Sequence, residues 1–407
     1  MIPYSFQTIY DDDIREVEKV LKSPFLTQGP KVKEFEEALK TKLKSKYVVA
    51  FSSGTSALLG LYFSLLYTKY KLFKSPKDFF YKKIFFFLTT PITFSATSNA
   101  AVFLGGLPLF VDVDENGNIS LDKLYTFLEI LKRKAKNILK NIKFASFVHY
   151  AGNPFNTQKI YEILKEYNIP LLEDACHALG AKNENEVVGE NKYSLGSVFS
   201  FHPVKPIACG EGGAVSTNDK KMYETLLLFR NHGLKKLSYW LYEKEFLSLN
   251  HRLSDIHAAL GLSQLKKLEK FLEKRRRLAK IYYKLFKDID FAKPIRQSNY
   301  SSYHLFPVRF KFKNLEKKKK YFENLRKKGI GVQVHYIPVY LLKFYKRLFK
   351  DFKEIYTKIY PSLDLKTFLK ESYKFYKEEL SIPLSQGLEE KDIYKIFDIL
   401  ISEYKKL

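Results

Sequence analysis

Short apolar runs alternate with helix-length segments through the first half of this 407-residue chain. Continuous apolar strands separated by helices are typical of a parallel sheet whose two faces are both covered. The pattern therefore predicts an α/β fold with a mostly parallel seven-stranded sheet. The seven runs are residues 48–51, 84–88, 107–113, 144–149, 169–173, 197–201 and 213–216, and two intervening helices are expected at 121–140 and 158–167.

The pattern changes in the second half of the chain. A long amphipathic helix is expected to begin at Ser254, because serine is a favoured N-cap residue. Its apolar face carries Leu260, Leu265, Leu268 and Leu272. Helices then alternate with a few strands, predicted at 303–310 and 331–335. We therefore predict a large domain at residues 1–249 and a smaller C-terminal α+β domain at residues 250–407.

In a mostly parallel sheet, functional groups gather at the carboxyl ends of the strands. One such segment is residues 52–57, Ser-Ser-Gly-Thr-Ser-Ala, which follows the first strand and opens a helix. Hydroxyls and free backbone amides at a helix N-terminus bind anions, so a phosphate site is one interpretation. An ordinary capped helix start is the other, and this short motif alone does not decide between them.

A second segment of this kind starts at Asp174, which leaves the end of a predicted strand. A carboxylate in that place can pair with the protonated ring nitrogen of a bound cofactor. It can equally cap the start of a helix. Without further context the two interpretations are comparable.

The third segment, residues 199–213, contains Lys205 among small and aromatic residues between two strand-like runs. A partly desolvated lysine has a lowered pKa, and its neutral amine is the nucleophile that Schiff-base chemistry needs. The alternative is one more surface lysine in a chain that has many.

The formal net charge of +26 raises nucleic-acid binding as a further alternative. The lysines are spread along the whole chain, and the densest runs, 275–277 and 317–320, fall in helical stretches, so solvated helix faces explain them better. Two cysteines cannot build a disulfide framework or a cysteine-rich metal site. The apolar runs are too short to cross a membrane, and the N-terminus lacks the features of a signal peptide. We expect a cytoplasmic protein with no nucleic-acid partner and no bound metal.

Further motifs follow in a fixed order along nearly the whole chain. They are residues 26–30 (Leu-Thr-Gln-Gly-Pro), 90–99, 108–114, 148–152, 230–233 (Arg-Asn-His-Gly), 250–255 (Asn-His-Arg-Leu-Ser-Asp) and 334–338 (Val-His-Tyr-Ile-Pro). Together with the three segments above, they resemble the DegT-type sugar-nucleotide aminotransferases. The resemblance implies the aspartate aminotransferase fold (fold type I) and pyridoxal 5'-phosphate as the cofactor.

The resemblance also assigns roles to single residues. Lys205 matches the lysine that forms the Schiff base, Asp174 the carboxylate that keeps the pyridine nitrogen protonated, and His177 a residue beside the ring hydroxyl. We therefore expect these three to be catalytic. The other expected cofactor contacts are Gly54, Thr55, Ser56, Phe94 and Ser200, with Asn250 from the neighbouring subunit of a homodimer. The expected substrate contacts are Thr27, Tyr150, His202, His335 and Tyr336.

Within the family, residues 26–29, 89–94, 114–119, 260–265 and 333–338 resemble the transaminases of pseudaminic acid biosynthesis. This implies a UDP-linked 4-keto-6-deoxy-N-acetylhexosamine and L-glutamate as substrates. The alternatives are a sister enzyme for another UDP- or dTDP-linked keto sugar, a sugar dehydratase, and a non-catalytic regulatory protein on the same scaffold. Dehydratases of the family usually carry histidine where this chain has Lys205. One departure from the family pattern is Ala208-Cys209, where many members have two threonines.

Overall fold

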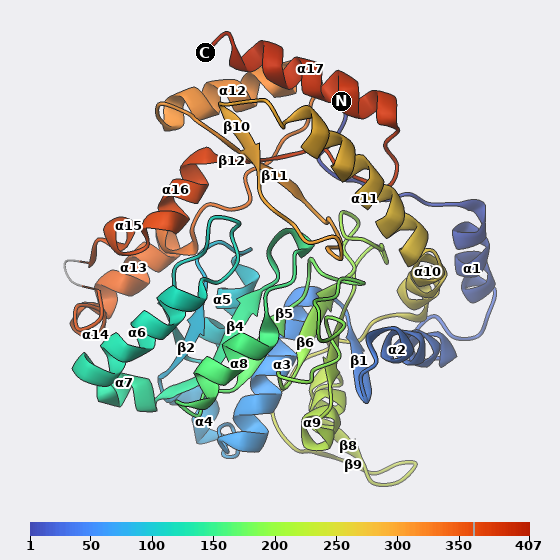
Figure 1. Cartoon of the computed structure of the whole chain (residues 1–407). Coiled ribbons are helices and arrows are strands. Elements are labelled where there is room, and N and C mark those ends of the chain that lie inside the picture. Colours follow the sequence, from blue (N-terminus) through green and yellow to red (C-terminus); the bar gives the residue numbers. More distant parts are fainter. Residues whose placement is uncertain (361–362) are drawn as a thin grey trace.

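The computed structural model describes residues 1–360 and 363–407. A seven-stranded sheet in the order β1-β7-β6-β5-β4-β2-β3 forms the centre of the molecule (Figure 1). Strands β2 to β6 pair in parallel, and β7 lies antiparallel to both of its neighbours. The predicted mostly parallel sheet is thus confirmed. The strands are β1 (Tyr47–Phe51), β2 (Phe85–Thr89), β3 (Gly106–Phe110), β4 (Ile142–Val148), β5 (Leu171–Asp174), β6 (Ser197–Ser200) and β7 (Gly213–Thr217).

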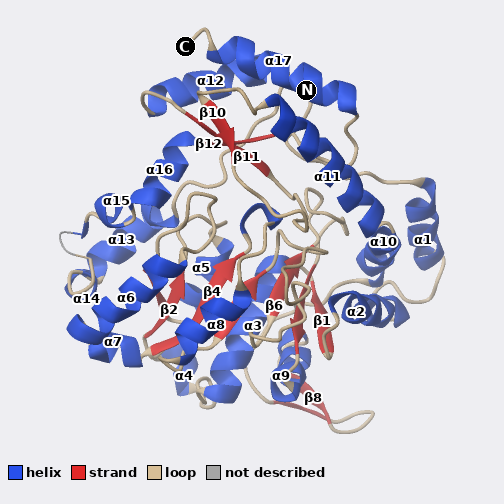
Figure 2. Cartoon of the chain, viewed as in Figure 1, coloured by secondary structure: helices blue, strands red, loops and turns tan. Residues whose placement is uncertain are grey.

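Helices cover both faces of this sheet (Figure 2). Phe86 and Leu88 of β2 belong to one hydrophobic cluster, with α6 and α8, whereas Phe85 and Phe87 belong to another, with α3, α5 and α9. Successive side chains of a strand point to opposite faces, so the two clusters lie on the two sides of the sheet. These helices are α3 (Gly54–Lys69), α5 (Ala96–Phe103), α6 (Leu121–Lys134), α8 (Thr157–Lys165) and α9 (Lys220–Arg230).

A second, three-stranded antiparallel sheet lies at the top of Figure 1. It consists of β10 (Ala292–Pro294), β11 (Phe306–Phe310) and β12 (Glu379–Ile382), and it packs with α11 (Leu268–Leu285), α12 (Leu315–Lys327) and α17 (Glu390–Tyr404) around one apolar cluster. The N-terminus joins this part of the molecule, because Ile2 bridges to Ile330 and the Leu384 N–H donates to the Tyr4 carbonyl at 2.9 Å. The predicted boundary at residue 250 remains a prediction.

Three predicted elements differ from the structure. The helix expected at 121–140 breaks at Ala135, which leaves the helical conformation with a φ of −147° and separates α6 from α7 (Lys136–Lys140). The helix expected from Ser254 does begin there, since the Ser254 hydroxyl accepts the His257 N–H at 3.3 Å. It is interrupted at Lys267, whose backbone N–H donates to the Gln264 carbonyl at 3.0 Å in the last turn of the first part. The two parts are α10 (Asp255–Lys266) and α11.

The strand expected at 331–335 was also wrong. The structure has only an isolated bridge between Gln333 and Ser381 in this segment. The physical reason is a competing acceptor, because the backbone N–H of His335 donates to the Glu379 carboxylate at 2.9 Å instead of to a neighbouring strand.

The remaining elements lie at the periphery. Helices α1 (Asp11–Leu21) and α2 (Pro30–Leu43) pack on α10, and α13 (Lys343–Asp351), α14 (Lys353–Tyr356), α15 (Leu365–Phe368) and α16 (Lys370–Glu378) lie at the left of Figure 1. Strands β8 (Leu234–Lys236) and β9 (Tyr242–Lys244) form a hairpin at the bottom of that view, and α4 (Lys77–Phe80) is short. Among the described residues, no helix combines the length and apolar character needed to cross a membrane.

Candidate active site

A cavity of about 640 Å³ lies at the carboxyl ends of the central strands, and loops of the C-terminal half form part of its lining. Ten of the fourteen residues predicted from the sequence line it. They are Gly54, Thr55, Phe94, Asp174, His177, Ser200, His202, Lys205, His335 and Tyr336. Segments far apart in sequence therefore converge on one site, as expected for the carboxyl edge of such a sheet.

One end of the cavity is the N-terminus of α3. The Ser53 hydroxyl caps this helix by accepting the Ser56 N–H at 3.1 Å. The N–H groups of Gly54 and Thr55 have no acceptor among the described residues, so they are free to bind an anion. Only glycine fits at position 54, since a Cβ atom there would lie 2.9 Å from the Ser200 Cβ.

Asp174 lies at the end of β5, where it is buried. Its Oδ2 accepts the Thr97 hydroxyl at 2.6 Å, and its Oδ1 accepts the Cys176 N–H at 3.1 Å. No helix begins after Asp174, because the chain continues in turns, so the helix-cap interpretation is wrong. These two contacts hold the carboxylate in place, and Asp174 lines the cavity.

Lys205 lies in the connection between β6 and β7, where its N–H donates to the His202 carbonyl at 2.8 Å. The residue is half-buried and lines the cavity. Burial lowers the pKa of Lys205 below the usual lysine value. The alternative of an ordinary surface lysine therefore does not hold, and the amine has the environment that a nucleophile requires.

Histidines and tyrosines form another part of the cavity wall. The His177 Nε2 and the Tyr336 hydroxyl lie 3.0 Å apart. Burial lowers the pKa of His177 well below its usual value and that of His335 to about 3, so both rings are neutral near pH 7. His177 Nδ1 and His335 Nδ1 are buried and have no hydrogen-bond partner among the described residues.

The sequence prediction did not name several residues that line the cavity, and two of them, His304 and Tyr4, bear on its chemistry. His304 Nε2 lies 3.4 Å from the Lys205 Nζ, and Tyr4 lines the cavity from the N-terminal segment. His304 fell inside a segment predicted as a strand, and Tyr4 precedes the first motif, so neither carried a local signal. Their placement depends on contacts between distant parts of the chain.

Four predicted residues do not line the cavity of their own chain. The Ser56 hydroxyl is bonded to Ser53 at 3.1 Å, inside the first turn of α3. Tyr150 is completely buried and donates its hydroxyl to the His335 carbonyl, so it lies behind the wall. Thr27 and Asn250 are exposed on the surface.

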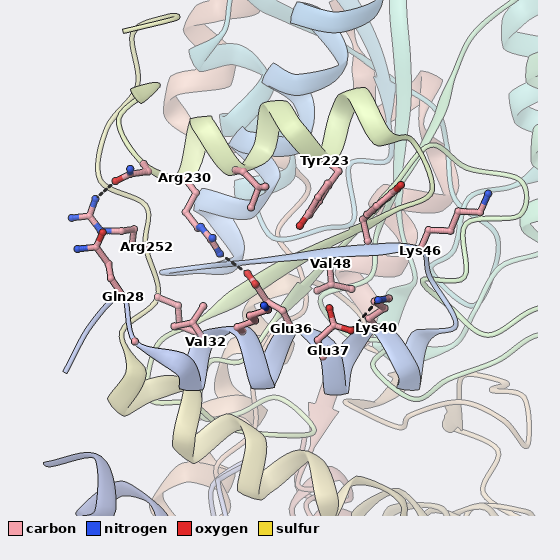
Figure 3. Close-up of a pocket in the computed structure, with 16 residues that line it drawn as sticks. Gln28, Val32, Glu36, Glu37, Lys40, Lys46, Val48, Tyr223, Arg230 and Arg252 are labelled. Atoms are coloured by element: carbon pink, nitrogen blue, oxygen red, sulfur yellow. Dashed lines mark hydrogen bonds and ion pairs between the residues drawn. The ribbon is translucent and has the colours of Figure 1, made fainter. Parts of the chain in front are cut away.

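A second cavity runs along β1, at the edge of the large sheet (Figure 3). Here Glu36 of α2 accepts the Ala50 N–H at 2.7 Å, and Arg230 of α9 donates to the Ala50 carbonyl at 3.3 Å and to the Glu36 carboxylate. The pair thereby satisfies the outward backbone groups of Ala50. None of the fourteen predicted site residues lines this cavity, so it is separate from the candidate active site.

Comparison with known proteins agrees with this geometry. Residues 7–401 match the DegT/DnrJ/EryC1/StrS aminotransferase family. The chain belongs to this family. It is 40% identical to the UDP-4-amino-4,6-dideoxy-N-acetyl-beta-L-altrosamine transaminase of Campylobacter jejuni subsp. jejuni serotype O:2, over 100% of this chain and 98% of that protein. The transaminase of the same name from Helicobacter pylori is 34% identical, over 99% and 97% of the two chains.

Solved structures show the same fold. The Helicobacter pylori PseC aminotransferase, involved in the biosynthesis of pseudoaminic acid, superposes with a TM-score of 0.84 at 32% identity and covers 100% of both chains. The PMP-form of the putative sugar aminotransferase Spr1654 from Streptococcus pneumoniae gives a TM-score of 0.83 at 25% identity, over 100% and 98% of the two chains. The fold-type-I family architecture predicted from the motifs is therefore confirmed.

Proposed function

We propose that this protein is a pyridoxal-phosphate-dependent aminotransferase that transfers an amino group from L-glutamate to a UDP-linked 4-keto-6-deoxy-N-acetylhexosamine. The product would be UDP-4-amino-4,6-dideoxy-N-acetyl-beta-L-altrosamine, an intermediate of pseudaminic acid. The observation that carries the proposal is the meeting of a lysine of lowered pKa, a fixed carboxylate and two free helix amides in one cavity. The names of the full-length relatives support the choice of sugar.

The residues of the cavity fit the cofactor. The free N–H groups of Gly54 and Thr55, with the Ser200 hydroxyl beside them, suit the phosphate. The carboxylate of Asp174 suits a protonated pyridine nitrogen, and Phe94 offers an aromatic face at the cavity rim. When bound, pyridoxal phosphate supplies an electron sink for the carbon that loses its proton.

The chain itself supplies proton transfer and orientation. We assign to the Lys205 amine the removal and return of the proton at the reacting carbon, because it lies in the same cavity as Asp174 and burial lowers its pKa. Asp174 keeps its orientation through Thr97 and the Cys176 N–H. His177 is oriented by Tyr336 across the cavity, which ties the two halves of the site together.

We propose that His202, His335 and Tyr336 contact the sugar, because they line the cavity above the amine. Tyr150 acts on the same wall from behind, by holding the His335 carbonyl. His335 is also fixed through its N–H, which donates to Glu379. Hydrogen bonds to the buried side chains of Tyr150 and Glu379 thus fix the backbone of His335 in this wall.

A homodimer with shared sites explains the remaining predicted residues. Asn250 and Thr27 are exposed, so they can meet a cofactor or sugar only across a subunit interface. The β8–β9 hairpin near Asn250 exposes Tyr239 and Trp240, whose side chains are 98% and 81% accessible. Clustered exposed aromatic residues mark protein interaction surfaces, and a two-fold axis would complete both sites reciprocally.

The decisive experiment supplies the purified protein with nitrogen-15-labelled glutamate and a panel of UDP-linked keto sugars. Mass spectrometry should find the label in the amino sugar formed from the 4-keto-6-deoxy-N-acetylhexosamine, and Lys205→Ala protein serves as the control. No label transfer to any sugar of the panel, by protein that carries its cofactor, would overturn the proposal. Transfer to a different sugar only would point to a sister enzyme.

A further inference from the structure

The guanidinium of Arg275, on α11, is completely buried and faces oxygens that carry no charge. Its Nε donates to the Gln386 side-chain oxygen at 2.9 Å, and its Nη1 donates to the carbonyls of Tyr303 at 3.1 Å and Leu384 at 3.0 Å. Burial without a carboxylate partner lowers the pKa of Arg275 to about 9. Burying a charged group costs free energy, so we ask what the remaining contacts of the Arg275 guanidinium hold in place.

Two of those contacts lead to Lys205. The Arg275 Nη2 donates to the Ser5 hydroxyl at 3.3 Å, and that hydroxyl donates to the carbonyl of Val204 at 3.1 Å, one residue before the lysine. The Arg275 Nη1 also donates to the His304 carbonyl at 3.4 Å. The His304 Nε2 lies 3.4 Å from the Lys205 Nζ. One buried guanidinium therefore fixes the backbone at both ends of the contact between Lys205 and His304.

We propose that His304 is a positioning residue for Lys205, with its Nε2 accepting a hydrogen bond from the lysine Nζ while Arg275 holds both partners in place. This inference rests on the proposed role of Lys205. In its ammonium form Lys205 can only donate, so Nε2 is then the acceptor and the ring proton lies on Nδ1, which is buried and has no acceptor among the described residues. When the amine is neutral, the same contact directs its lone pair away from His304 and toward the rest of the cavity.

The surroundings of His304 favour orientation over proton exchange. Burial, and then the charge of Lys205, lowers the pKa of His304 well below its usual value. The ring therefore stays neutral and does not compete with Lys205 for the proton. The ring of His177 lies beside that of His304, with the two centroids 4.5 Å apart.

The test compares His304→Phe, which keeps a flat ring but removes the acceptor, with His304→Gln, which keeps an acceptor. The measured quantity is the pKa of the Lys205 amine in the full-length protein, after hydroxylamine has removed the cofactor. It comes from the pH dependence of acetylation by acetic anhydride, quantified by peptide mass spectrometry against the exposed Lys270. Losing an acceptor destabilises the ammonium form, so the pKa should fall by about one unit in the Phe variant. It should return toward the wild-type value in the Gln variant.

The controls separate positioning from general damage. His335→Phe removes another buried imidazole of the cavity that makes no hydrogen bond to Lys205, and it should leave the Lys205 pKa unchanged. His304→Leu replaces the Phe variant if thermal melting shows that the latter does not fold. An unchanged pKa in the folded Phe or Leu variant overturns the proposal, as does a Gln variant that behaves like Phe.

The steady-state parameters give a second measurement. His304→Phe should lower kcat about tenfold and leave the KM for the keto sugar near the wild-type value, since the role assigned to the histidine acts on the lysine. The acetylation experiment needs no sugar substrate. The pKa of Lys205 can therefore be measured, and the role of His304 tested, even if the protein does not catalyse the proposed reaction.

Discussion

The Thr97 hydroxyl of α5 donates to the Asp174 carboxylate of β5 at 2.6 Å, so one buried threonine fixes the group that faces the proposed cofactor ring. Thr97→Val keeps the shape of the side chain and removes this donor. A hydrogen bond to a charged group contributes about 1.5–3 kcal/mol, so the half-reaction with glutamate should slow by roughly tenfold or more. Stopped-flow absorbance of the loaded enzyme measures it. Thr97→Ser keeps the hydroxyl, so its rate should stay close to that of the wild type. Equal rates for the Val variant and the wild type would show that Thr97 does not support the function of Asp174.

Lys205→Ala should abolish amino transfer, because the amine is both the covalent partner of the cofactor and the proposed proton carrier. The variant should still bind pyridoxal phosphate through the Gly54 and Thr55 amides, detected by equilibrium dialysis. It should no longer retain the cofactor covalently after borohydride treatment. Lys270→Ala, at an exposed position of α11, is the matched control and should keep full activity. Turnover near the wild-type rate in the Lys205 variant would refute the assignment.

Asn250→Ala should weaken cofactor binding without removing the covalent link to Lys205. Losing one hydrogen bond to the phosphate raises the dissociation constant by about ten- to a hundredfold. Mixing Lys205→Ala chains with Asn250→Ala chains gives a sharper test. In the heterodimer, one site carries both substitutions and the other carries neither, so activity should return on mixing. If proven subunit exchange restores nothing, Asn250 serves its own chain and the shared-site proposal fails.

Asp114 predicts a pH effect on stability. Burial raises the pKa of this turn residue from 3.8 to about 6, although its Oδ1 accepts the Asn116 N–H at 2.8 Å. The folded state therefore holds the proton more tightly than the unfolded state, and the free energy of unfolding should fall as the pH rises from about 4 to about 6, by at most about 3 kcal/mol. Asp114→Asn keeps an acceptor and should flatten this slope. Urea unfolding at a series of pH values measures the effect, and an equal slope in both proteins would contradict it.

Much of the fold was predictable because the strands of a covered parallel sheet are apolar throughout. The segment containing Phe85–Thr89 is an example, since its side chains enter clusters on both faces. The break at Lys267 was not predictable, because the apolar spacing of Leu265, Leu268 and Leu272 continues across it. The contact of Lys267 with Asp13 was equally hidden, since it joins residues more than two hundred positions apart in sequence. Local periodicity reports on the face that a helix buries and is silent about partners from distant segments.

The same distinction applies to the site. Asp174 and Lys205 were recognisable because each follows a strand inside a family motif, and the structure brings them into one cavity. Tyr150 lies in such a motif too, yet it supports His335 from the interior and does not face the cavity. His304 had no motif of its own. A family motif indicates that a residue belongs to the site region. Only the packing shows whether its side chain lines the cavity or supports a neighbouring residue that does.

The pairing of Glu36 and Arg230 around Ala50 also affects how this protein behaves at high concentration. Strand β1 ends the large sheet, and an open strand edge is a template on which another molecule can add its own strand. The carboxylate and the guanidinium occupy the outward N–H and carbonyl of Ala50, so an incoming strand finds charge in place of free backbone groups. The two side chains thus oppose aggregation through this strand edge, in a protein whose many aromatic residues would otherwise favour aggregation.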